Sequence, residues 1–149
     1  MSVIKVQGLS KNFGAIQAVD QLSFEVEEGQ VYGFLGQNGS GKSTLANIIT
    51  GRENYEVTSG TVNFNGNNVL DMSPENRALE GIFMSFQYPV VIPGVNNTYF
   101  LRAALNSKLK HNGLKEVNAA DFMRLIREKL KLVEMDEKYL GRAVNDGFS

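Results

Sequence analysis

The stretch of sequence that decides the fold is Gly36-Gln37-Asn38-Gly39-Ser40-Gly41-Lys42-Ser43. It matches the P-loop pattern G-x-x-x-x-G-K-[ST] at every fixed position. Glycines at these spacings let backbone N–H groups approach a polyphosphate closely, and the helix that follows turns its positive end to the same place. Lys42 is then expected to reach the β- and γ-phosphates of ATP, and the Ser43 hydroxyl to ligate Mg²⁺. The alternative interpretation is a glycine turn that only starts a helix.

The residues on either side support the motif. Residues 31–35 (VYGFL) form a short apolar run, which is typical of a strand buried on both faces. Residues 42–50 carry apolar side chains at helical spacing, and Gly51 stands where a helix C-cap belongs. Strand, glycine loop and helix in this order form the context in which the motif binds phosphates. We therefore expect residues 36–44, ending at Thr44, to bind the nucleotide.

Further strands are predicted on both sides of the motif. Residues 3–9 and 22–26 alternate apolar and polar side chains and predict two strands, with residues 10–14 as a loop. Residues 60–64 and 67–70 flank Asn65-Gly66, the dipeptide most typical of a two-residue hairpin turn. Residues 82–86 (IFMSF) are strand-like and run into a loop that carries two prolines.

Three more helices are predicted. Ser73 is a cap and Pro74 a first helical residue, residues 97–106 have a helical pattern, and Asn118 caps a longer helix. In the last helix the apolar residues at helical spacing predict a core-facing stripe. They are Phe122, Leu125, Ile126, Leu130 and Val133. The fold class expected from all these elements is α/β.

Composition excludes several classes of protein. The chain has 149 residues, with 15 basic and 16 acidic side chains, so nothing in its charge favours nucleic-acid binding. There is no cysteine, and the one histidine, His111, lies in a polar stretch typical of a solvated loop. No apolar run approaches the ~20 residues of a membrane span, and the N-terminus does not resemble a signal peptide. We expect a soluble, cytoplasmic chain without direct membrane insertion.

Two residues gain meaning from the P-loop. Phe13 is placed to stack on a purine, and its alternative is an ordinary core phenylalanine. Gln87, at the end of the strand-like residues 82–86, is placed to point its amide at Mg²⁺ or at water near the γ-phosphate, and its alternative is a polar strand end. Hydrolysis also needs a carboxylate after a second buried strand. Residues 69–71 have too short an apolar run and residues 132–136 belong to a helix, so we expect no catalytic residue in this chain.

These motifs resemble the ATP-binding-cassette (ABC) ATPases. Phe13 is similar to the family's adenine-stacking aromatic, residues 36–43 to its Walker A motif, and Gln87 to its Q-loop glutamine. Four segments are more specifically similar to the SufC ATPases of the Suf iron–sulfur cluster assembly machinery. They are residues 55–60, residues 85–89 together with 92–95, residues 100–106 and residues 144–149. Residues 12–37 look closer to ATPases of membrane transporters, because SufC proteins usually carry proline where Gln37 stands.

The resemblance implies a fold, cofactors and partners. It implies an incomplete ABC-type domain over residues 1–149: a β subdomain with the P-loop core over residues 1–96, and a helical subdomain over residues 97–149. Phe148-Ser149 is similar to the opening of the signature motif, and the Walker B strand, D-loop and switch histidine are not in the chain. The implied cofactors are ATP and Mg²⁺, and the implied partners are SufB/SufD-like scaffold proteins and a second ATPase subunit in an ATP-dependent dimer. A transporter ATPase and a nucleotide-binding fragment without turnover remain the alternatives.

Overall fold

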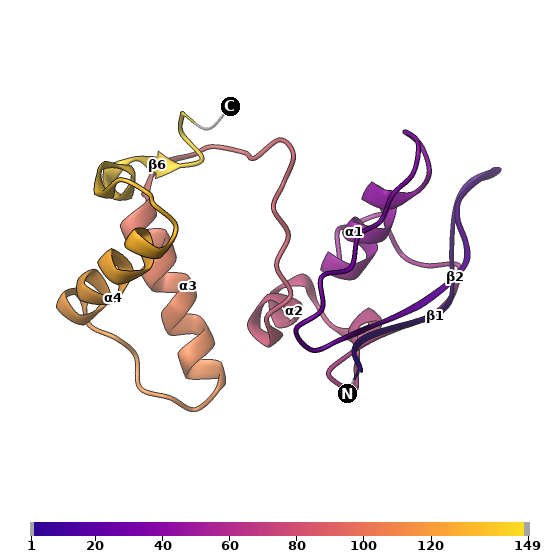
Figure 1. The fold of residues 1–149 in the computed structure, drawn as a ribbon, viewed down its shortest axis with the longest axis horizontal. Helices are drawn as coiled ribbons and strands as arrows, with labels where there is room; N and C mark the ends of the chain where they lie inside the picture. Colours follow the sequence, from indigo (N-terminus) through magenta and orange to yellow (C-terminus); the bar gives the residue numbers. More distant parts are fainter. Residues whose placement is uncertain (1, 148–149) are drawn as a thin grey trace. The chain divides into compact units, whose positions relative to one another are not determined.

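The computed structural model describes residues 2–147, and these fall into two compact units, Met1–Met84 and Ser85–Ser149. Figure 1 traces the elements of each. The sequence placed the subdomain boundary between residues 96 and 97. In the structure residues 92–96 form a strand that pairs with residues 143–144 and lie in the second unit. The expected subdomain boundary stays a prediction.

The first unit is built on an antiparallel sheet with strand order β2-β1-β3-β4. Its strands are β1 (Ser2–Phe13), β2 (Ile16–Glu27), β3 (Ser59–Phe64) and β4 (Asn67–Asn68). The predicted hairpin around Asn65-Gly66 is present, although β4 is short and continues into the 3-10 helix η1 (Val69–Asp71). The predicted loop over residues 10–14 is wrong, because Lys11 pairs with Val19 and the strands continue to a turn after Phe13.

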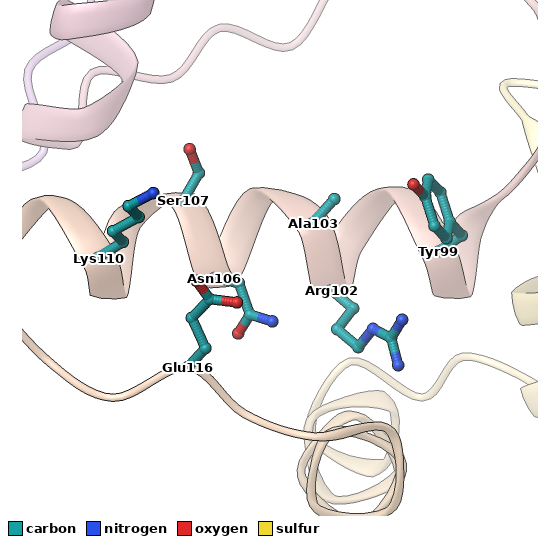
Figure 2. Close-up of a pocket in the computed structure, with 7 residues that line it drawn as sticks. All are labelled: Tyr99, Arg102, Ala103, Asn106, Ser107, Lys110 and Glu116. Atoms are coloured by element: carbon teal, nitrogen blue, oxygen red, sulfur yellow. The ribbon is translucent and has the colours of Figure 1, made fainter.

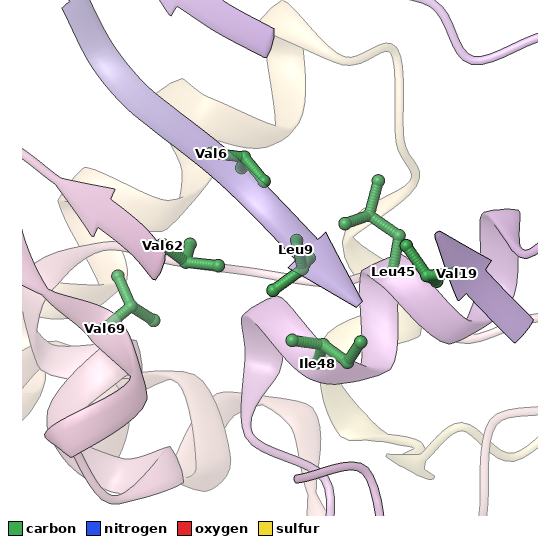
Figure 3. Close-up of a cluster of buried hydrophobic side chains, with 7 residues drawn as sticks. All are labelled: Val6, Leu9, Val19, Leu45, Ile48, Val62 and Val69. Carbon is green, nitrogen blue, oxygen red and sulfur yellow. The ribbon is translucent and has the colours of Figure 1, made fainter. Parts of the chain in front are cut away.

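Two helices complete this unit, α1 (Lys42–Thr50) and α2 (Pro74–Glu80). The α1 residues Leu45 and Ile48 turn toward Leu9 and Val19 of the sheet and close the core with them (Figure 3). Val6, Val62 and Val69 complete this cluster. The predicted caps are confirmed: Gly51 ends α1, and the Ser73 hydroxyl accepts from the Asn76 N–H at the start of α2.

Two predicted strands do not form. Residues 31–35 belong to neither sheet, and Val31 and Leu35 are 100% and 99% exposed. Tyr32 and Phe34, between these two residues, pack against Phe24 of β2, with ring centroids 5.4 and 4.8 Å from that of Phe24. A strand needs a neighbour to bond its backbone, and no strand within residues 2–147 supplies one here. Residues 82–86 lack a partner strand in the same way, so the strands formed within residues 2–147 include no parallel pair.

The second unit contains β5 (Ile92–Asn96), α3 (Asn97–His111), α4 (Ala119–Leu132), η2 (Glu137–Gly141) and β6 (Ala143–Val144). The helix predicted over residues 97–106 is confirmed and runs further. Asn118 caps α4 as predicted, since its Oδ1 accepts from the Asp121 N–H at 2.9 Å. Two residues of the predicted apolar stripe, Phe122 and Leu130, are buried. The prediction that Val133 faces the core is wrong, because Val133 is 65% exposed. It is the C-cap residue and does not lie within the helix.

No helix among residues 2–147 is both long and apolar enough to cross a bilayer.

Candidate functional site

The glycine loop is closed around the ammonium group of Lys42. Its Nζ donates to the carbonyl oxygens of Gly36 at 2.7 Å and Gln37 at 2.8 Å, and lies 3.1 Å from the Ser40 Oγ. The loop also bonds itself across a turn, because the Ser40 N–H donates to the Gln37 carbonyl at 3.2 Å. One side chain therefore holds both ends of the loop.

At two positions of the loop, a Cβ in place of the glycine hydrogen would come too close to a neighbouring atom. A Cβ on Gly36 would lie 2.6 Å from the Ser40 Oγ. Gly41 has φ +85°, and a Cβ there would meet the backbone carbonyl oxygen of Ala18. The Ser40 hydroxyl can rotate away from the first contact, but the Ala18 backbone cannot avoid the second. Gly41 therefore has a steric reason in addition to close approach of a phosphate.

The helix that follows presents an open positive end. The first i→i−4 bond of α1 joins the Leu45 N–H to the Gly41 carbonyl at 2.9 Å, so the amides of the first three helical residues precede the helical ladder. Gly41 provides no side-chain cap, and the first turn of α1 holds no acidic residue. The free amides and the helix dipole at this end favour binding of an external anion.

A hollow of about 460 Å³ adjoins the loop within the first unit. It is lined on one side by loop and helix residues and on the other by strand β2 and the end of residues 31–35. The lining residues are Gln17, Ala18, Val19, Asp20, Leu22, Phe34, Leu35, Gly39, Ser40, Gly41, Lys42 and Leu45. The glycine loop, Lys42 and this space together fit a bound polyphosphate. The residues that would hold ATP and Mg²⁺ at this end are Lys42, Ser43 and Thr44, with the loop residues Gln37, Asn38 and Gly39.

Phe13 lies in the same unit but not in this hollow. It ends β1 instead of lying in a loop, and its side chain is 39% exposed. Tyr55 meets its ring edge-on with centroids 5.4 Å apart, and the Lys11 Nζ lies 4.7 Å from its centroid. Neither neighbour could be singled out from the sequence, since both contacts depend on tertiary packing. Stacking of adenine on Phe13 stays a prediction.

Gln87 belongs to the second unit and is exposed. It follows residues 82–86, which do not form the strand that was expected to position it, and Phe83 among them is 88% exposed. Its role toward Mg²⁺ stays a prediction. Phe148 and Ser149, similar to the opening of a signature motif, lie outside the described residues.

A second hollow, of about 290 Å³, lies along α3 (Figure 2). Arg102 and Lys110 face it from the helix and Glu116 from the segment that follows, so its charges have both signs. Asn106 in its wall is already engaged: its amide donates to the Val117 carbonyl at 3.1 Å and accepts from the Val117 N–H at 2.9 Å. This hollow has no feature that selects a ligand. Within residues 2–147 no three His, Cys, Asp or Glu side chains gather where they could hold a metal ion.

Comparison with known proteins agrees with this geometry. The ABC transporter family profile matches residues 19–149. Escherichia coli "Probable ATP-dependent transporter SufC" is 53% identical over 86% of this chain and 52% of its own length. Synechocystis "Probable ATP-dependent transporter slr0075" is 43% identical over 99% of this chain and 58% of its own length. The chain thus spans little more than half the length of these curated relatives.

Solved structures show the same fold. The ATP-binding cassette MJ0796, in a dimeric post-hydrolysis state bound to ADP and Pi, superimposes with a TM-score of 0.76. The match covers 95% of this chain and 62% of that one at 23% identity, so it bears on the fold alone. The chain therefore belongs to the ABC transporter family, has a homologue in SufC, and carries part of the fold of an ATP-binding cassette.

Proposed function

We propose that this chain binds the polyphosphate of ATP through residues 36–44 and acts as the ATP-binding part of a SufC-like subunit. The observation that carries the proposal is the loop held around the Lys42 ammonium at the open positive end of α1. A polyphosphate that enters offers Lys42 anionic acceptors in place of two neutral carbonyls. The exchange favours binding because it adds the attraction between two opposite charges to the hydrogen bonds.

The remaining residues have separate tasks. The first amides of α1 orient the phosphates, the Ser43 hydroxyl serves as a metal ligand, and Gln87 is the proposed Q-loop glutamine. Mg²⁺, when bound, would neutralise charge on the β- and γ-phosphates. Phe13 supplies a face for adenine. No residue of this chain is assigned a catalytic role.

Calorimetry on the purified chain tests nucleotide binding. The chain should bind MgATP and inorganic triphosphate and should bind adenosine much more weakly, because most of the expected contacts go to phosphates. Equal binding of ATP and adenosine, or no binding of triphosphate, would reject the assignment. The inclusion of inorganic triphosphate separates the phosphate site from any adenine contact.

We further propose that the subunit serves iron–sulfur cluster assembly in the cytoplasm, with SufB/SufD-like scaffold proteins as partners and ATP-dependent pairing with a second ATPase subunit. Support comes from the SufC relative and from the dimeric cassette of the same fold. The alternative is a transporter ATPase, which the relatives' names as ATP-dependent transporters favour. Co-purification with a SufB/SufD-like pair, set against a transporter membrane subunit, separates the two partner classes.

A further inference from the structure

Arg77 is a buried cation that hydrogen-bonds the C-terminal end of α1 from a different helix. It lies in α2 and is 6% exposed. Its Nη1 donates to the Ile48 carbonyl at 2.6 Å and to the Ile49 carbonyl at 3.2 Å, both in the last turn of α1. Its Nε donates to the Met72 carbonyl at 3.0 Å, which fixes the guanidinium in place.

The end of α1 is built to receive this guanidinium. The last turn of α1 contains no basic residue, so the cation at its negative end comes from 29 residues further along the chain. Gly51 lies directly beneath it, and a Cβ there would be 2.9 Å from the Arg77 Cζ. Burial lowers the pKa of the Arg77 guanidinium. An arginine nevertheless remains charged at every ordinary pH.

We propose that Arg77 is a positioning residue for phosphate binding, because it holds the helix whose opposite end receives the phosphates. This rests on the proposed function and extends it to a residue remote from the ligand. α1 has nine residues, and helices shorter than ~12–15 residues are marginal without tertiary support. Fixing the last turn therefore keeps the first turn in place, with its open amides and Lys42.

Positioning has to be separated from direct attraction between Arg77 and the phosphates. At 1.5 Å per residue, α1 places its two ends roughly 13 Å apart. Arg77 is buried, so salt screens its charge only in part. Hydrogen exchange separates the two effects: loss of positioning quickens exchange at the amides of α1, whereas loss of a distant charge alone leaves it unchanged.

The test compares Arg77→Met and Arg77→Lys with the unmutated chain and with Arg124→Met. Arg124 is an exposed arginine paired with Asp121 in the second unit, so its variant removes the same charge elsewhere. Calorimetry measures affinity for inorganic triphosphate and for ATP at low and high salt. Circular dichroism establishes that each variant is folded at the temperature used.

We expect Arg77→Met to bind triphosphate about three- to tenfold more weakly, a range set by typical helix-terminus effects. The loss should be equal for ATP and triphosphate and should persist at high salt. Arg77→Lys should recover part of it, and Arg124→Met should bind normally. Hydrogen exchange at the amides of residues 45–50 should quicken in Arg77→Met.

A folded Arg77→Met that binds triphosphate as tightly as the unmutated chain overturns the inference. If Arg77→Met does not fold, Arg77→Lys decides it in the same way. If the unmutated chain binds no triphosphate, the proposed function fails by itself. The positioning of α1 is then judged from hydrogen exchange, and unchanged protection of residues 45–50 in Arg77→Lys would reject it.

Discussion

The Nζ of Lys42 lies 2.7 Å from the carbonyl oxygen of Gly36, six residues earlier, and so closes the glycine loop with a side chain from the helix. Lys42→Ala removes both the phosphate ligand and this closure. We expect affinity for triphosphate to fall at least about tenfold, since hydrogen bonds to charged groups contribute about 1.5–3 kcal/mol. Adenosine affinity should stay the same. Calorimetry checks both, with Lys131→Ala in α4 as the control, and an unchanged ATP affinity would remove the assignment.

Phe13→Ala should lower ATP affinity by about 1–3 kcal/mol, the range for stacking of a base on an aromatic ring. Affinity for inorganic triphosphate should not change, because the ring is expected to meet only the adenine. Phe83→Ala is the control, since Phe83 is an exposed phenylalanine of the same unit. Equal affinity of the unmutated chain for ATP and triphosphate would count against an adenine contact.

Residues 1–149 alone should not hydrolyse ATP at a useful rate, even with Mg²⁺ in excess. We propose that Lys42 and Ser43 position phosphates, and we expect no carboxylate among residues 2–147 to complete the metal site or act as base. Losing one charge-stabilising group in phosphoryl transfer costs ~10³–10⁵ in rate. Phosphate release should appear when the second half of a SufC-like relative is added. A monodisperse chain that turns over unaided, and stops when Lys42 becomes alanine, would contradict this.

Gly60→Ala should destabilise the first unit by about 1–3 kcal/mol, the usual cost of overpacking or of a strained backbone. Gly60 has φ +96°, and a Cβ there would lie 2.5 Å from the Gly8 carbonyl oxygen and the Leu9 Cα. Gly33→Ala is the matched control, because its Cβ would meet nothing within 4 Å. Urea unfolding measures both free energies, and equal stability of the two variants would show that β1 and β3 can separate without cost.

The carboxyl of Glu137 should titrate at a low pH. A hydrogen bond from Arg127, and then the charge of that guanidinium 2.8 Å away, lower the pKa of Glu137. A lowered carboxyl pKa stabilises the fold above the unfolded-state pKa, and the contribution is lost as pH falls through the folded-state pKa. Arg127→Met should raise the pKa of Glu137 in an NMR titration, while Arg124→Met should leave it alone. No change in Arg127→Met would refute the pairing.

Elements set by local chemistry could be predicted from the sequence. Ser73, Asn118 and the Asn65-Gly66 turn each form with partners within a few residues, so a short window holds the information. Lys42 and the loop were predictable for the same reason, because the closure spans only six residues.

Features that depend on distant partners could not be predicted. Residues 31–35 have the composition of a buried strand, but burial requires neighbours that residues 2–147 do not supply. Arg77 has no local motif, and its contacts with the end of α1 are visible only in the folded chain. The sheet extends through residues 10–13 because β2 pairs there, which overrides the loop-forming composition of that stretch.

The uncovered side of residues 31–35 has a consequence for how the chain behaves in concentrated solution. The stretch is uncharged and without proline. Tyr32 and Phe34 contact Phe24, while Val31 and Leu35 face water. Such a segment is a template on which a second copy can add its own backbone. Glu27 and Glu28 precede it and repel the same pair on an approaching copy. Salt weakens that repulsion, so the chain should precipitate more readily as ionic strength rises, and dilute, low-salt buffers should keep it monomeric.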